Sequence, residues 1–147
     1  MHTEILLVGV SLALGLTGCQ TAQEAAIVAP ISRVNSLGLT GSTGVLRLCF
    51  TNPNPVPLLV SCSTHELKLG DKSLGTIDDE EPIGLPPFGT VEHSVVLNPK
   101  ITLAAQGYLN NTPGRVYARV NSALVLILAD DDFFSIKSMG SGLVHAP

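Results

Sequence analysis

The chain has 147 residues, of which 45% are hydrophobic and only 14% are charged. This length suits one domain, and the composition excludes an intrinsically disordered chain, which would be poor in apolar residues. The formal charge of −4 and the absence of Trp argue against a nucleic-acid partner, which needs a basic face and stacking aromatic rings.

The N-terminus carries an uncharged run of twelve residues, Ile5 to Leu16. As a helix this run would be about 18 Å long, too short for a bilayer core of about 30 Å. We therefore predict that it is the apolar part of a secretory signal. Leu16, Thr17, Gly18 and Cys19 close the run, and this order resembles the lipobox of bacterial lipoproteins.

The lipobox resemblance implies a signal peptide over residues 1–18 and a lipidated Cys19. Two or more acyl chains anchor a protein stably, whereas one is marginal. Gln20, in place of the Asp that marks inner-membrane retention, implies the periplasmic side of the outer membrane. Residues 19–30 would form a lipidated tether and 31–147 the domain. The alternative is an ordinary signal peptide in which a Cys occurs by chance.

The first part of the domain combines a glycine-rich segment with an alternating one. Residues 38–44 contain three glycines, with neither a preceding strand nor a following Lys, so we predict a flexible loop rather than a phosphate site. Val45–Phe50 alternates, with Leu46, Leu48 and Phe50 on one side, which predicts a strand.

A second strand is predicted over residues 58–69, after a proline-rich turn. Its apolar residues change face along its length, which predicts a bulge near Ser61–Ser63. A turn at 70–72 then leads to a hairpin partner at 73–77.

The later elements also have local signals. Val91–Leu97 alternates and predicts a strand with His93 on its apolar face. Asn98 and Pro99 predict the start of a short helix over 101–109, since Asn caps helices and Pro is tolerated at their first position. Further strands are predicted at 115–129 and 133–144, around a turn at Asp130–Asp132. Several strands spaced by turns indicate a mainly β protein, an antiparallel β-sandwich with one short helix.

Two cysteines remain after Cys19, in a compartment that permits disulfides. If the chain reverses symmetrically about Pro55 and Val56, Cys49 and Cys62 face each other across neighbouring strands. A disulfide there would add about 3 kcal/mol on the chain-entropy model. The alternative is two buried free thiols, or one exposed thiol.

Leu48–Leu58, which reads LCFTNPNPVPL, resembles the Asn-Pro-Asn segment of the late-embryogenesis-abundant group 2 family, or WHy (water stress and hypersensitive response) domain. Residues 66–70 and 85–90 follow in the family's order, and the resemblance covers residues 31–144. It implies an immunoglobulin- or fibronectin-III-like β-sandwich, protection under desiccation, and no catalysis.

The motif residues Asn52, Pro53, Asn54 and Pro55 have a structural use. The prolines exclude helix, and Asn side chains can satisfy backbone groups of turns. A contact to a ligand is the alternative.

The reactive side chains form no recognisable site along the sequence. His65, His93 and His145 stand on separate elements without zinc-ligand spacing. The acidic segments 78–81 and 130–132 are interpreted as solvated loops, with Ca²⁺ binding as the alternative. We therefore expect neither a metal nor a cofactor, and no enzyme.

The expected protein is a lipid-anchored, stress-protective binding module of the cell envelope. Its partner is the membrane, through the anchor. The alternative is a periplasmic interaction or lipid-handling module that binds a protein partner or an acyl chain.

Overall fold

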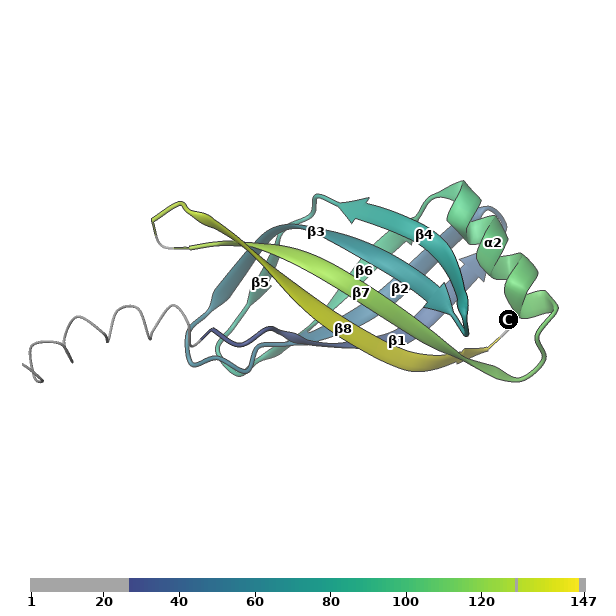
Figure 1. The fold of residues 1–147 in the computed structure, drawn as a ribbon, viewed down its shortest axis with the longest axis horizontal. Coiled ribbons are helices and arrows are strands. Elements are labelled where there is room, and N and C mark those ends of the chain that lie inside the picture. Colours follow the sequence, from purple (N-terminus) through teal and green to yellow (C-terminus); the bar gives the residue numbers. More distant parts are fainter. Residues whose placement is uncertain (1–26, 129, 146–147) are drawn as a thin grey trace, which may run out of the picture.

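The computed structural model describes residues 27–128 and 130–145, so the signal segment and Cys19 lie outside the described residues. The described part is mainly β, with eight strands and one helix (Figure 1). In chain order these are β1 (Ile31–Thr40), β2 (Thr43–Thr51), β3 (Leu58–Leu69), β4 (Lys72–Asp79), β5 (Ile83–Leu85), β6 (Thr90–Leu97), α2 (Pro99–Asn110), β7 (Arg115–Ile127) and β8 (Phe133–His145).

The strands form two antiparallel sheets. Sheet A has the order β1-β2-β6, and sheet B has the order β4-β3-β7-β8, with β5 paired to β3. Helix α2 lies at one end of the sandwich, and the β2–β3, β5–β6 and β7–β8 connections lie at the other end (Figure 1). The predicted fold class, a β-sandwich with one helix, is confirmed.

The core lies between the sheets and follows the predicted alternation. Leu46, Leu48 and Phe50 of β2 are fully buried against the inner face of sheet B. The predicted bulge in β3 is also confirmed, because the pairing of β3 with β7 shifts register between Val60 and Cys62. The bulge lets both halves of β3 direct apolar side chains inward although their sequence parity differs.

Helix α2 begins as its sequence signals predict. The side chain of Asn98 accepts a hydrogen bond from the backbone N–H of Ile101 at 2.8 Å, and Pro99 is the first helical residue. Ile101, Ala105 and Leu109 face the core. The residues that the structure describes include no helix with the length and apolar character of a membrane span.

The glycine-rich segment 38–44 is not a flexible loop, and that prediction was wrong. Its first residues complete β1, Gly41 and Ser42 make a tight turn, and β2 begins at Thr43, with Thr40 and Thr43 paired. Gly41 has a φ of +60°, a backbone conformation that favours glycine. At position 44 glycine is required by packing instead, because a Cβ there would lie 2.9 Å from side-chain atoms of Leu97 and of Thr102.

The two sheets meet along one side through small residues of β8, which we call the glycine seam: Ser138, Gly140 and Gly142. The hydroxyl of Ser138 donates to the carbonyl of Pro30 at 2.5 Å and contacts the Ser32 hydroxyl at 3.0 Å. A Cβ on Gly140 would lie 2.6 Å from the Ser32 hydroxyl, and one on Gly142 would overlap the carbonyl oxygen of Val34. The backbones of β1 and β8 therefore pack directly on each other without a ladder between them.

The predicted opposition of Cys49 and Cys62 was wrong. Cys49 pairs with Arg33 and Glu92 within sheet A, whereas Cys62 pairs with Val125 within sheet B. The proline-rich connection carries the chain from one sheet to the other and does not form a hairpin between β2 and β3. Both cysteines are free thiols, with Cys49 buried and Cys62 partly exposed.

Candidate functional site

The Asn52 side chain joins the connections at the end of the sandwich away from α2. Asn52 is fully buried. Its Nδ2 donates to the carbonyls of Val56 at 2.9 Å, Leu85 at 3.1 Å and Pro86 at 3.1 Å, while its Oδ1 accepts from both the backbone N–H and the Nδ2 of Asn54 at 2.9 Å. One amide thus satisfies backbone groups from two proline-rich segments, neither of which can supply ladder bonds at its prolines.

Asn54 continues this network to the N-terminal segment. Its Oδ1 accepts from the N–H of Val28 at 2.8 Å, and its Nδ2 donates to the Val28 carbonyl at 2.8 Å. The side-chain amide therefore pairs with Val28 as a neighbouring strand would. Domain contacts thus begin before Ile31, the boundary expected from sequence, and the position of Val28 is fixed by the motif.

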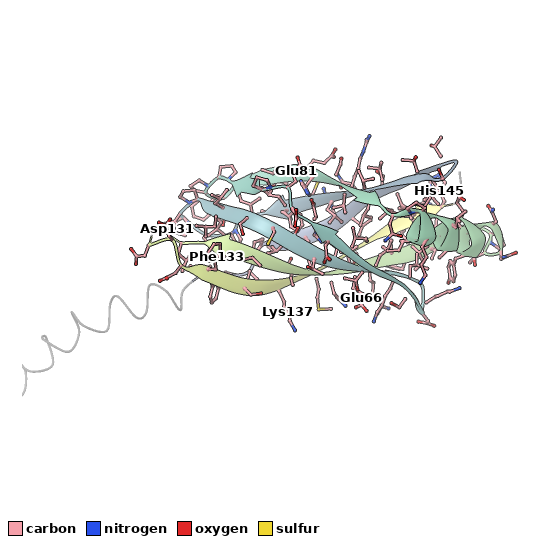
Figure 2. All side chains as sticks on the ribbon, turned by 90° about the horizontal axis from the view of Figure 1, so that it is seen from above. Glu66, Glu81, Asp131, Phe133, Lys137 and His145 are labelled. Carbon is pink, nitrogen blue, oxygen red and sulfur yellow. The ribbon has the colours of Figure 1, made fainter. Side chains whose placement is uncertain are left out.

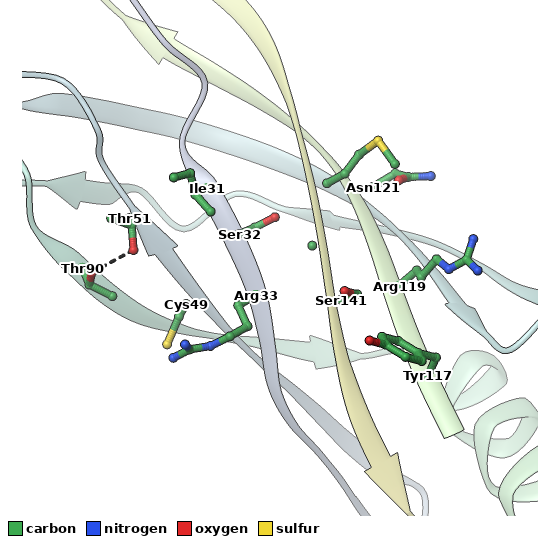
Figure 3. A pocket seen from close by; sticks show the side chains of 12 residues that line it. Ile31, Ser32, Arg33, Cys49, Thr51, Thr90, Tyr117, Arg119, Asn121 and Ser141 are labelled. Carbon is green, nitrogen blue, oxygen red and sulfur yellow. Dashed lines mark hydrogen bonds between the residues drawn. The ribbon is translucent and has the colours of Figure 1, made fainter. Parts of the chain in front are cut away.

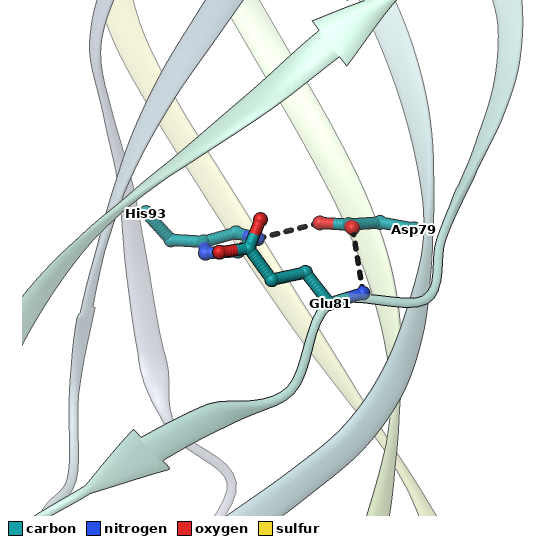
Figure 4. A group of neighbouring side chains, drawn as sticks. All are labelled: Asp79, Glu81 and His93. Atoms are coloured by element: carbon teal, nitrogen blue, oxygen red, sulfur yellow. Dashed lines mark hydrogen bonds and ion pairs between the residues drawn. The ribbon is translucent and has the colours of Figure 1, made fainter.

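The side of the sandwich opposite the glycine seam is joined by a histidine and a carboxylate. His93 of β6 and Asp79 of β4 come from different sheets, and His93 Nε2 lies 2.5 Å from Asp79 Oδ2. Both side chains are nearly buried. Asp79 Oδ1 also accepts from the backbone N–H of Glu81 at 3.0 Å (Figure 4). The segment 78–81 is therefore not wholly a solvated loop, because Asp79 ends β4 and holds the two sheets together.

Glu81 completes a cluster that offers metal ligands. One ligand atom each from Asp79, Glu81 and His93 lie within 4.8 Å of one another. An imidazole with two carboxylates is a ligand set that Zn²⁺ accepts, with a fourth position left for water. The sequence did not reveal this grouping, since Asp79 and His93 come together only when the sheets pack.

His65 forms a separate, fully buried network. Its Nε2 lies 2.9 Å from the Ser63 hydroxyl, and its Nδ1 lies 2.7 Å from the Ser122 hydroxyl. Burial lowers the pKa of His65 to about 4, an effect that the nearby Asp79 carboxylate opposes and His93 reinforces. His65 is therefore neutral at pH 7, and its engaged ring is inaccessible to a substrate.

The His65 network predicts a loss of stability in acid. Between a pKa of 6.5 in the unfolded chain and about 4 in the folded one, the unfolded state binds a proton that the folded state does not. Stability is thus fully present above pH 6.5 and decreases as the pH falls towards 4, by at most about 3 kcal/mol from this group. Urea unfolding measured across this pH range should show that the free energy of unfolding falls less steeply with decreasing pH for His65→Gln than for the wild type.

Because carboxylates also titrate in this range, the matched control is His145→Gln, which removes an exposed histidine. The free energy of unfolding of this variant should fall with decreasing pH as steeply as that of the wild type. Equal slopes for His65→Gln and wild type would contradict a neutral buried His65.

A groove of about 720 Å³ crosses the outer surfaces of both sheets beside the glycine seam (Figure 3). Sheet A contributes Arg33 and Cys49, and sheet B contributes Tyr117, Arg119 and Met139. The groove combines two cationic side chains with apolar ones, so it suits an anionic or amphipathic ligand.

Comparison with known proteins identifies the fold. No protein-family model and no curated protein matches the sequence. The solution structure of At1g01470 from Arabidopsis thaliana matches with a TM-score of 0.59 and 16% identity, over 83% of this chain and 85% of that chain. The solution structure of a late embryogenesis abundant (LEA) protein, At2g46140.1, matches with a TM-score of 0.51 and 20% identity, over 98% of this chain and 86% of that chain. The chain therefore has the fold of an LEA protein, as the resemblance of its Asn-Pro-Asn segment implied.

Proposed function

We propose that the protein is a lipid-anchored, non-catalytic module of the bacterial cell envelope that protects its surroundings under desiccation and related stress. The observation that carries this proposal is the fold shared with an LEA protein. The lipobox-like order ending at Cys19 supports anchoring, and Gln20 supports the outer membrane. Protection of this kind needs a stable surface and no turnover.

The fold supplies such a surface at the end of a tether. The Asn54 amide fixes Val28 against the domain, so a chain anchored at Cys19 would be attached to the sandwich at the end that carries the Asn-Pro-Asn motif. His65, whose pKa is lowered by burial, lies between two serine hydroxyls, which supports a structural role for it.

A drying assay tests the protective function. A desiccation-sensitive reporter enzyme is freeze-dried with the purified full chain, or with an equal mass of albumin as control. We expect the full chain to preserve more reporter activity than albumin does. Equal recovery in the two samples would contradict the proposal.

The groove beside the glycine seam supports a second function, the binding of an acyl chain or other amphipathic ligand. Arg33 and Arg119 would face an anionic head group, and Tyr117 and Met139 would contact its apolar part. Lipid extraction of the purified protein followed by mass spectrometry tests whether the groove holds a lipid. Lipid recovered from the wild type but not from Arg119→Glu would favour it, and lipid-free protein would count against it.

A further inference from the structure

Large apolar side chains are exposed at the end of the sandwich opposite α2. We call this set the apolar end: Val28, Val56, Leu59, Phe88, Phe133 and Phe134, each at least 41% exposed. It includes three of the four phenylalanines in the chain, and the fourth, Phe50, is fully buried in the core. Because exposed apolar side chains gathered in one place mark interaction sites, this end requires an explanation beyond folding.

Hydrogen bonds and strand pairing show that these residues share one end. The backbone N–H of Phe88 donates to the Asn54 carbonyl at 3.2 Å, and Asn54 in turn holds Val28. Leu59 pairs with Ile127, which pairs with Phe133. Phe133 and Asp131 lie together at the extremity of the sandwich, and His145 lies near the other extremity (Figure 2).

Phe88 is held outward in a strained conformation. Its φ is +54°, a region that bulky residues rarely adopt, and its side chain is 68% exposed. A hydrogen bond from the Gly89 N–H to the Pro86 carbonyl at 2.9 Å, and one from the Asn52 N–H to the Gly89 carbonyl at 2.8 Å, fix the turn around it. Glycine would relieve the strain, and the exposed ring adds little to the core, so the aromatic side chain points to a binding role.

The charges at this end indicate which partner fits. Residues 52–57, 86–89 and 128–132 contain no Lys or Arg, and three aspartates, Asp130 to Asp132, precede Phe133. An anionic partner would be repelled, whereas an uncharged apolar or interfacial surface would be accepted.

The covalent connection brings a lipid surface within reach. Cys19 precedes Val28 by nine residues, a segment that spans at most about 32 Å when fully extended. Since Asn54 holds Val28 at the apolar end, the attachment point of an acylated Cys19 lies within this distance of the apolar end.

We propose that the apolar end inserts its phenylalanines into the interfacial region of the membrane that holds Cys19, so that the sandwich stands with α2 away from the lipid. The inference rests on the proposed anchoring. Aromatic rings favour the interface between head groups and acyl chains, and a second membrane contact strengthens a lipid anchor. Phe88 and Phe133 are the central contacts.

Single tryptophans test the orientation, since the chain has no Trp of its own. Phe88→Trp and Phe133→Trp place the reporter at the apolar end. Leu103→Trp, at an exposed position of α2, is the matched control. Each full-length variant is mixed with phosphatidylcholine–phosphatidylethanolamine vesicles, and its acylation state is determined by intact-mass measurement. We expect the emission of the first two variants to shift to shorter wavelength and to be quenched by brominated lipid, and that of Leu103→Trp to remain unchanged.

The outcomes separate this inference from the proposed anchor. An uncleaved, unacylated mass would overturn the anchor, while a vesicle-dependent shift at Phe88→Trp would still support the apolar end. Unchanged emission at both apolar-end positions of an acylated protein would overturn the inference alone. A stronger shift on adding phosphatidylglycerol, or a shift that follows protein concentration without vesicles, would also overturn it, in favour of charge-driven binding or of self-association.

Discussion

Replacing Asn52 with Asp is expected to lower the free energy of unfolding by about 3–5 kcal/mol, because a buried side chain that donates hydrogen bonds becomes one that only accepts them. The Nδ2 of Asn52 donates to three carbonyls, those of Val56, Leu85 and Pro86. A carboxylate oxygen in its place would face the same three carbonyl oxygens in a site without solvent exposure. The shape of the side chain is nearly unchanged, so the loss measures hydrogen bonding rather than packing.

Urea unfolding at pH 7 measures this loss, and Asn111→Asp is the control. Asn111 also donates through Nδ2, to the Gly107 carbonyl at 2.9 Å, but in an exposed site. Asn111 is also the C-cap of α2, where a carboxylate opposes the helix dipole, so we expect Asn111→Asp to cost no more than about 1 kcal/mol. A loss below about 1 kcal/mol for Asn52→Asp would show that the connections at this end do not depend on the Asn52 amide.

Replacing Gly142 with Ala is expected to cost about 3 kcal/mol, at the upper end of the range for overpacking. The added methyl group would overlap the carbonyl oxygen of Val34 and lie 3.0 Å from its Cβ. The obstacle is backbone, which cannot rotate away as the end of a flexible side chain can. Strand β1 would have to move away from β8, and the core residue Val34 would be exposed in part.

Gly38→Ala is the matched control, because Gly38 also lies in a strand, β1, and a Cβ there meets nothing within 4 Å. We expect thermal or urea unfolding to show little change for Gly38→Ala and a clear loss for Gly142→Ala. If the two variants were equally stable, the glycine seam would not be a close backbone contact.

The sequence by itself determined most of the strands, the helix and several turns, because their signals are local, whereas β1 and β5 were not predicted. The alternation of Leu46, Leu48 and Phe50 placed β2, and the change of face within 58–69 placed the bulge. Asn98 and Pro99 marked the first residues of α2. Each signal depends only on the geometry of a few successive residues, which is the same in any fold.

Only the tertiary structure decided which strands meet. No local signal shows that the proline-rich connection changes sheets, so Cys49 and Cys62 were predicted as neighbours although they lie in different sheets. Glycines that the chain needs for packing, such as Gly44, cannot be distinguished by sequence from glycines of a flexible loop. His93 and Asp79 meet because the edges of two sheets come together. Such pairings depend on the packing of the whole core, and no local pattern carries that information.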